Sequence, residues 1–496
     1  MLLSLQNFRK DYGTHFRETI KLSIPVIIGQ LGQYLMGFID NLMIGQLSYV
    51  HLSAASLANI MFYILTILGM GITFAISPLV AEANGANNHR KVGDYLKQGL
   101  WVSIFASVVL GAAVYFSAWV IPFMDQPEKE VDLAVSYTKI LSYSVLPMMV
   151  FLIAKQFTDG LSLTRPAMFI TLIGLGFNTF ANWILIFGQF GMPRLELDGA
   201  GYGTLASRSL MAILMMGYVF WHKRFKIYEV TSNWMKLNGA IIRKILGIGL
   251  PSGMQYFFEV AAFGGCTIMI GWMEDGSAYR AAHVIALQMA ALAYMVVLGT
   301  SAGSSIRVGT ALGRKDYVNV RRAGFTGVIL ATGFMVIVGI VFSLGNELFP
   351  SYFIQSNSTE MAADKDLIAK LPLVAETAAK LMYIAAIFAV FDGVQAVGVG
   401  ILRGIQDVKI PTWITFFAYW VINLPLGYFL AFNLNMQVYG VWWGFVVALA
   451  FASVALLWRY NWLTGKLIEQ QENEGKSMEK VAQTEQSPDP ALPTIS

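Results

Sequence analysis

Three carboxylic acids lie inside long apolar stretches of this sequence, where a charge is costly. They are Asp40 in MGFIDNLMIGQ, Glu259 in MQYFFEVAAFGG and Asp392 in IFAVFDGVQAVGVG. None of them has a Lys or Arg three or four residues away, so none is neutralised along its own helix. Because ionisable groups inside a membrane typically serve ion or substrate pathways, we expect these acids to bind a cation or a proton.

Two asparagines, Asn178 and Asn182 in LGFNTFANWILIFG, are four residues apart and therefore share one face of a helix. Their amide oxygens are hard ligands that suit Na⁺ beside a carboxylate, and their NH₂ groups can hold the carboxylate without the metal. Hydrogen bonding between helices is an equally good explanation for the pair on sequence alone.

One further cation and one thiol lie in apolar stretches. Arg208, in GTLASRSLMAIL, is either the counter-charge of a buried acid or a side chain that snorkels to the outer interface, and we favour snorkelling. Cys266 is the only cysteine, so it forms no internal disulfide, and we expect it to pack in the protein interior.

The elements that position these residues are membrane-spanning helices. The chain of 496 residues is 56% hydrophobic and 13% charged, whereas soluble domains are about a quarter charged. Apolar runs near the ~20 residues that cross a bilayer recur throughout, which predicts an all-α polytopic membrane protein of twelve transmembrane helices. The predicted spans are 22–44, 54–80, 98–122, 138–158, 167–188, 199–221, 246–271, 282–305, 324–345, 381–401, 411–431 and 438–458.

Lys and Arg collect in alternate loops between these spans. The basic segments are 9–21, 90–97, 222–244, 307–322 and 403–409, while the loops between them carry few cations. The positive-inside rule therefore predicts that both termini are cytoplasmic.

The sequence is internally repeated. LSIPVIIGQLGQ at the start of the first span resembles IGLPSGMQYFFE at the start of the seventh, which pairs Pro25 with Pro251. GITFAISPLVAEANGANNHRKV likewise aligns with GTSAGSSIRVGTALGRKDYVNV. Two halves of six spans insert in the same orientation, so we expect two pseudo-symmetric lobes about an axis normal to the membrane. The alignment places Asp40 opposite Cys266, so the lobes share a scaffold but not their charged groups.

The predicted domains follow from this repeat. Residues 1–221 form the N-lobe, 222–245 a basic cytoplasmic linker and 246–458 the C-lobe. The polar segment 459–496 is expected to be a disordered cytoplasmic tail, and the insert 346–376 an external loop or short surface helix.

No enzyme signature is present. The chain lacks a phosphate-binding Gly-rich loop, and its five histidines show no metal-ligand spacing. The net charge of +4 comes from loop residues, so we expect the lipid bilayer and no nucleic acid as a partner. Transport driven by an ion gradient, with no cofactor, is the function class that remains.

The chain resembles the multidrug and toxic compound extrusion (MATE) family, and specifically its NorM-type branch, over residues of about 15–460. The motifs that carry the resemblance are MGFIDNLMIGQLS, PSGMQYFFEV, FDGVQAVGVGILRGIQDVKIPT, YWVINLPLGYFL and the two asparagines. One departure is TDGLSLTRPAM in the first half, which lacks the R-G dipeptide seen at Arg403-Gly404.

The resemblance implies an antiporter of the bacterial inner (plasma) membrane, functional as a monomer, that exports amphipathic, often cationic, compounds in exchange for Na⁺ or H⁺. It places Asp40, Asn178 and Asn182 in an N-lobe coupling network and Glu259 with Asp392 in a C-lobe cation site. Either group could hold Na⁺, and a carboxyl group in apolar surroundings could carry a proton instead.

Two alternatives fit less well. A lipid-linked oligosaccharide flippase of the wider superfamily would need a cationic cleft for pyrophosphate, whereas the buried charges here are acidic. A polytopic membrane enzyme acting on lipid would need catalytic groups clustered near one interface, whereas these acids are spread over three spans.

Overall fold

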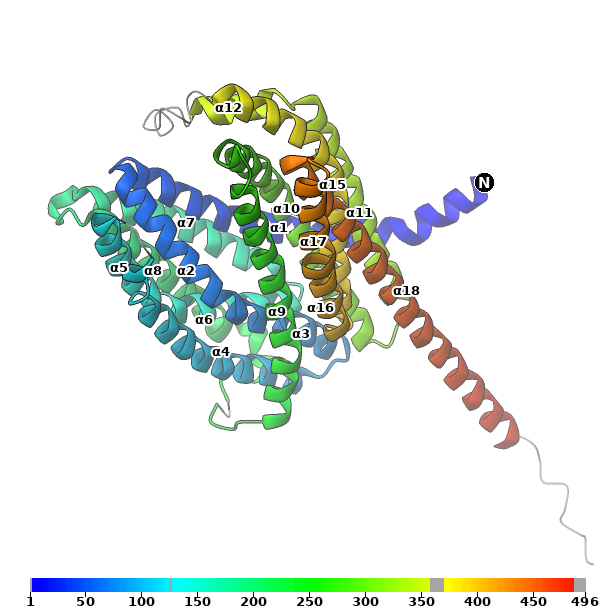
Figure 1. Cartoon of the computed structure of the whole chain (residues 1–496). Coiled ribbons are helices and arrows are strands. Elements are labelled where there is room, and N and C mark those ends of the chain that lie inside the picture. Colours follow the sequence, from blue (N-terminus) through cyan, green and yellow to red (C-terminus); the bar gives the residue numbers. More distant parts are fainter. Residues whose placement is uncertain (1, 125–126, 233, 357–369, 486–496) are drawn as a thin grey trace, which may run out of the picture.

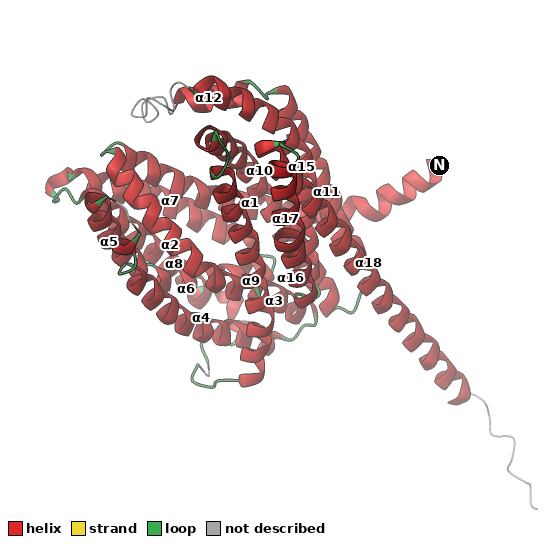
Figure 2. Ribbon diagram, viewed as in Figure 1, coloured by secondary structure: helices red, strands yellow, loops and turns green. Residues whose placement is uncertain are grey.

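The computed structural model describes residues 2–124, 127–232, 234–356 and 370–485. These residues form helices joined by short turns, without a β-strand among them (Figure 2). Ten of the described helices are long and apolar enough to cross a membrane, and the bent pair α5 and α6 makes an eleventh span. The chain is therefore the all-α, multi-pass membrane protein that the hydropathy pattern predicts.

The helices fall into two halves. Those of the first half are α1 (Leu2–Gly45), α2 (Tyr49–Phe74), α3 (Ile76–Gly85), α4 (His89–Ser117), α5 (Glu128–Tyr143), α6 (Val145–Gly160), α7 (Thr164–Phe187) and α8 (Glu196–Trp221). Those of the second half are α9 (Gly239–Gly271), α10 (Gly276–Gly313), α11 (Tyr317–Leu344), α12 (Leu348–Ser356), α15 (Leu371–Gly404), α16 (Lys409–Phe416), α17 (Leu424–Tyr428) and α18 (Gln437–Glu485). Two π-helical turns, η4 (Phe417–Asn423) and η5 (Phe429–Asn433), join α16, α17 and the turn before α18.

The predicted seventh span, 246–271, lies in α9, which is not among the ten apolar helices. Its 33 residues are long enough to cross a bilayer. Gln255, Glu259 and several glycines lower the hydropathy of its apolar stretch.

The backbone repeats as the sequence does. Non-glycine residues with a left-handed conformation occur at equivalent loops of the two halves: Asn87 and Lys315, Ser162 and Gln406, and Glu196 and Gln437. The next helix is capped alike after the first pair, since Asn88 and Asp316 each accept a hydrogen bond from the backbone three residues on. The matching turns are what two pseudo-symmetric halves predict.

The first helix of each half starts against the opposite half. Residues near Ser23 and Ile27 of α1 pack on α10, whereas Gly32 of α1 packs on α7. The equivalent helix α9 packs on α2 at Gly249 and Gly253, and from Pro251 onward it also packs on α16 and then on η4. Figure 1 accordingly shows the N-terminal end of α1 on the side of the second-half helices.

The contacts between the halves lie at the end that carries the basic loops. Gly71 of α2 and Gly253 of α9 are so close that a β-carbon on either residue would overlap the other helix. Glu82 Oε2 accepts hydrogen bonds from Lys244 Nζ at 3.2 Å and from Gln406 Nε2 at 2.6 Å. From these contacts the ribbons of α2 and α9 diverge toward the other end (Figure 1).

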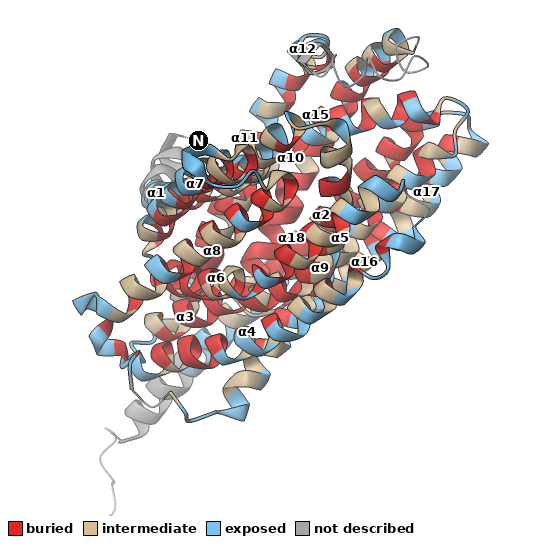
Figure 3. Ribbon diagram, turned by 90° about the vertical axis from the view of Figure 1, so that its left-hand side faces the viewer, coloured by how far each residue is buried: buried red, intermediate tan, exposed pale blue. Residues whose placement is uncertain are grey.

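Apolar side chains cover the outside of the helices as well as their interior. Phe105 of α4, Ile337 of α11 and Val454 of α18 are 74%, 61% and 69% exposed. Figure 3 shows buried residues along the inner faces and exposed ones on the outer faces of the same helices. Such an apolar exterior is suited to lipid rather than to water.

The linker and the tail differ from expectation. The predicted linker 222–245 ends earlier, because α9 begins at Gly239, where the Asn238 side chain caps two backbone N–H groups. The predicted disorder of 459–496 is wrong for 459–485, since α18 continues to Glu485. This segment is rich in Glu, Gln and Lys, which are strong helix formers even without an apolar face. Residues 486–496 lie outside the described part of the chain.

The insert 346–376 contains the short helix α12 and the start of α15. The short surface helix was one of the two expected forms. The middle of the insert, residues 357–369, lies outside the described residues.

Candidate functional site

Asp40 lies on α1 beside α7 and α8. Its Oδ1 accepts a hydrogen bond of 2.6 Å from Asn182 Nδ2, and its Oδ2 accepts one of 3.4 Å from Thr204 Oγ1. The structure therefore brings Asp40 and Asn182 together, although they are 142 residues apart in sequence. Thr204 was not singled out from sequence, because a lone threonine on a glycine-rich helix carries no distinctive pattern.

Asn178 lies one helical turn before Asn182 and belongs to the same cluster, but its hydrogen bond is to a residue of α8. Its Nδ2 donates to Ser207 Oγ at 3.4 Å, and its side chain interacts more weakly with Asp40 than that of Asn182 does. Both asparagines are fully buried, and the Oδ1 atoms of both accept no hydrogen bond. Two buried amide oxygens without a donor, next to a carboxylate, are a set of oxygen atoms that suits a hard cation.

Gly203 makes this cluster sterically possible. A β-carbon at Gly203 would overlap Asn182 Oδ1, so only glycine at this position of α8 lets the amide reach Asp40. The preceding Gly199, one turn earlier, likewise lies against the backbone of α7 at Leu185 and Ile186. The close approach of α7 and α8 thus positions the polar cluster.

Arg208 does not snorkel to the outer interface, and that expectation is wrong. Its Nη1 donates a hydrogen bond of 2.6 Å to Ser144 Oγ, at the bend between α5 and α6. Its guanidinium lies 4.8 Å from the ring centre of Phe62 and interacts electrostatically with Asp40. The side chain points into the N-lobe because Arg208 shares a helix face with Thr204, which contacts Asp40.

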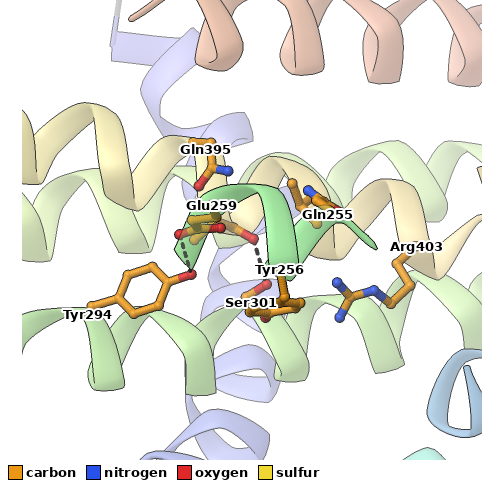
Figure 4. Close-up of a pocket in the computed structure, with 9 residues that line it drawn as sticks. Gln255, Tyr256, Glu259, Tyr294, Ser301, Gln395 and Arg403 are labelled. Carbon is orange, nitrogen blue, oxygen red and sulfur yellow. Dashed lines mark hydrogen bonds between the residues drawn. The ribbon is translucent and has the colours of Figure 1, made fainter. Parts of the chain in front are cut away.

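Glu259 on α9 forms a second cluster, in the C-lobe. Tyr294 of α10 donates its hydroxyl to Glu259 Oε1 at 3.4 Å. Figure 4 shows the Glu259 carboxylate between Tyr294 and Gln395, with Arg403 at the far side of the pocket. The cavity there is about 10 Å³, room for roughly one water molecule or a small cation and too small for a drug.

Asp392 lies on α15, one turn before Gln395. Glu259 and Asp392 are 8% and 5% exposed and interact electrostatically. Asp392 does not line the pocket around Glu259, whose wall on α15 is formed by Gln395, Ala396, Val399 and Arg403. The two acids therefore interact electrostatically, but only Glu259 lines this pocket.

Arg403 was noted in the sequence only as part of a loop motif, yet it borders the Glu259 pocket. Its guanidinium lies beside a pair of packed rings, 5.2 Å from the centre of Phe74 and 5.8 Å from that of Tyr256. Phe74 belongs to α2 and Tyr256 to α9, so the pocket adjoins the contact between the lobes.

A fourth buried acid was missed. Asp159 Oδ2 lies 3.7 Å from Lys155 Nζ on α6, and both side chains are less than a tenth exposed. The four-residue spacing of Lys155 and Asp159 was a readable signal for an ion pair along the helix. Lys155 is therefore a further cation inside the predicted spans, besides Arg208.

The C-lobe contains an uncharged counterpart of the Asp40 cluster. Asn423 Nδ2 lies 3.5 Å from Cys266 Sγ, and a β-carbon at Gly444 would lie 3.0 Å from Asn423 Oδ1, as one at Gly203 would meet Asn182 Oδ1. The sequence repeat pairs Asp40 with Cys266, and the structure confirms that each holds the equivalent place beside an asparagine. The scaffold is shared, and the carboxylate is present in the N-lobe alone.

The chemistry available in both acidic clusters is cation binding. Among the described residues, no group of three or more His, Cys, Asp and Glu side chains is placed to hold a metal ion. The groups in the N-lobe cluster that can bind a cation are a carboxylate, amide oxygens and a hydroxyl. These groups suit Na⁺ or a proton better than they suit a transition metal.

Comparison with known proteins gives a consistent result. The MatE family model matches residues 25–184 and 251–429, so the two matched segments begin at Pro25 and at Pro251. The probable multidrug resistance protein NorM of Agrobacterium fabrum is 32% identical over 451 residues, 90% of this chain and 94% of that protein. The multidrug resistance protein NorM of Photobacterium profundum is 30% identical over 463 residues, 92% and 97% of the two chains.

Solved structures share the fold at lower identity. The eukaryotic MATE transporter AtDTX14 has a TM-score of 0.79 at 18% identity, over 92% of this chain and 99% of that one. A MOP superfamily transporter from Pyrococcus furiosus has a TM-score of 0.80 at 19% identity, over 91% of this chain and 96% of that one.

Proposed function

Because the chain belongs to the MatE family, we propose that it is a secondary active multidrug efflux antiporter. It exports amphipathic, often cationic, compounds in exchange for Na⁺ or H⁺, and it uses no cofactor besides the coupling ion. It acts as a monomer in the bacterial inner membrane, with both termini in the cytoplasm. Relatives named multidrug resistance proteins, at 30–32% identity over nine-tenths of the chain, support the efflux role.

The observation that carries the coupling is the Asp40 cluster. A carboxylate held by Asn182, with two buried amide oxygens that accept no hydrogen bond, is poised to exchange a bound cation. A proton would bind to the carboxyl group alone, whereas Na⁺ would use the amide oxygens as well. Glu259, with Asp392 nearby, forms the second cation site, in the C-lobe.

Exchange follows from occupancy of these acids. When the protein faces outward, the acids bind Na⁺ or H⁺ and the affinity for the exported compound falls. When it faces inward, the ion leaves, the acids regain their charge and a cationic compound binds. Each ligand thus favours one of two conformations, and the ion gradient drives the cycle.

Ethidium efflux from energised cells that express the protein tests this function. We expect efflux under an imposed Na⁺ or proton gradient, and we expect Asp40→Asn to abolish it while the protein remains in the membrane. Na⁺ pulses compared with pH jumps identify the ion. The absence of efflux under both gradients contradicts the antiporter, and normal ion-dependent efflux by Asp40→Asn contradicts the coupling role of Asp40.

A further inference from the structure

We infer that Arg208 is a positioning residue that sets the cation affinity of the N-lobe site, as a permanent positive charge next to Asp40. This inference rests on the proposed coupling function of Asp40 and deepens it. A carboxylate that binds its ion too tightly cannot release it, so a transporter needs a device that limits the affinity. The guanidinium is such a device, because it stays charged under all physiological conditions.

The register of α8 brings Arg208 to the site. Thr204, Ser207 and Arg208 are spaced at three and four residues, so they lie on one helix face. Thr204 donates to Asp40, Ser207 receives the hydrogen bond of Asn178, and Arg208 follows one turn after Thr204. One turn is about 5.4 Å along the axis, which places the guanidinium within electrostatic reach of the carboxylate.

Two contacts hold the guanidinium away from direct pairing with Asp40. Nη1 donates to Ser144 Oγ at 2.6 Å, and the ring of Phe62 lies 4.8 Å beneath the guanidinium. Among the described residues, no carboxylate lies within 4 Å of Arg208. Asp40 therefore keeps its oxygen atoms available for a cation while it experiences the field of the guanidinium.

The charged and titratable groups that face one another here are few. They are Asp40 of α1, Tyr63 of α2, Tyr137 of α5 and Arg208 of α8. Arg208 is the one positive charge in this group, and it opposes an incoming cation. Its repulsion weakens the binding of Na⁺ and of H⁺ alike.

The C-lobe counterpart supports a role in the site rather than in the fold. Arg208 follows Gly203 by five residues, and Leu449 follows Gly444 by the same interval. Thr204 and Ser207 correspond in the same way to Phe445 and Ala448. The C-lobe, which has Cys266 in place of Asp40, thus forms the same helix pair without an arginine. The arginine is found in the lobe that has the carboxylate.

The test is the cation concentration at half-maximal ethidium efflux in proteoliposomes, measured for Arg208→Gln, Arg208→Lys and wild type. We expect Arg208→Gln to lower that concentration about tenfold for whichever ion drives transport, as removal of a nearby like charge requires. Arg208→Lys keeps the charge and is expected to lie near wild type. Arg194→Gln removes an exposed cation from the loop before α8 and serves as the matched control, with no shift expected.

A wild-type half-maximal concentration in Arg208→Gln overturns the inference, provided that Asp40→Asn abolishes the cation dependence. If Asp40→Asn itself keeps that dependence, the proposed coupling site is wrong, which is a separate outcome. Should Arg208→Gln fail to fold, Ser144→Ala decides, since it frees the guanidinium from its anchor. Because the freed guanidinium can approach Asp40, a shift to a higher half-maximal cation concentration supports the inference, and no shift contradicts it.

Discussion

Single residues in the N-lobe cluster differ in what they do for the ion. Asn182 donates a hydrogen bond of 2.6 Å to Asp40, whereas Asn178 donates to Ser207 and interacts more weakly with Asp40. A hydrogen bond to an ionised group contributes about 1.5–3 kcal/mol, and it stabilises the carboxylate over the protonated acid. Loss of the hydrogen bond from the amide NH₂ therefore strengthens proton binding to Asp40. Loss of the amide oxygen weakens Na⁺ binding instead.

We expect Asn182→Ala to identify the coupling ion by the sign of its effect. If protons drive transport, the carboxyl group binds its proton more tightly, and the midpoint of the pH profile rises by about one unit. If Na⁺ drives transport, loss of an oxygen ligand raises the half-maximal Na⁺ concentration instead. The measurement is efflux in proteoliposomes against pH and against Na⁺.

Asn178→Ala is the matched control for this experiment. It leaves the 2.6 Å hydrogen bond from Asn182 to Asp40 in place and removes only a weaker interaction with that carboxylate, so the pH midpoint should shift less than in Asn182→Ala. If Asn182→Ala changes neither the pH midpoint nor the half-maximal Na⁺ concentration, Asn182 serves packing alone.

At the scale of elements, the site depends on how closely α7 and α8 approach. Gly199 and Gly203 lie one turn apart on α8 and meet α7, and the second of them leaves room for the Asn182 amide. The same arrangement recurs in the C-lobe, where Gly444 meets Asn423. A pair of glycines four residues apart lets membrane helices pack closely, and here that packing also presents polar groups to a carboxylate.

Gly203→Ala should impair coupling more than folding. The added methyl group overlaps Asn182 Oδ1, which pushes the amide away from Asp40. We expect a change of several-fold or more in the cation concentration at half-maximal efflux, with the protein still inserted. Gly444→Ala is the milder counterpart in the C-lobe, because its β-carbon would lie 2.9 Å from the Gly427 α-carbon and 3.0 Å from Asn423 Oδ1. It is expected to lower the melting temperature without altering cation dependence. Equal cation dependence in the two variants would contradict this explanation.

At the scale of the whole molecule, the lobes are held together at the end with the basic loops. Glu82 of the N-lobe accepts hydrogen bonds from Lys244 and Gln406 of the C-lobe, and Arg307 of α10 donates to Thr19 of α1 at 2.7 Å. Alternation between two conformations requires these contacts to break. Buried close contacts between glycines cannot stretch gradually, so the halves are expected to separate as rigid bodies.

Glu82→Ala should shift this equilibrium toward separation at the basic end. Loss of both hydrogen bonds from one acceptor removes about 1–3 kcal/mol from the closed form, enough to raise the open population several-fold. Spin labels on the exposed residues Arg90 and Arg314 report the distance between the lobes. Glu376→Gln, an exposed acid paired with Lys380 within α15, is the control. Identical distance distributions in Glu82→Ala and wild type would show that Glu82 does not hold the lobes together.

The sequence alone determined the class of protein, the positions of the spans, the twofold repeat and the acids on which the proposal rests. It could do so because a bilayer demands long apolar helices, so that each carboxylate inside one stands out from its neighbours. The tertiary structure decided what those acids touch. That Thr204 meets Asp40, that Arg208 turns inward to Ser144 and that α1 and α9 begin against the opposite lobe depend on helix rotation and crossing. The local sequence pattern specifies neither the rotation nor the crossing of a helix, because many rotations of an apolar helix bury a similar area. Only close packing between segments distant in sequence selects one of these rotations.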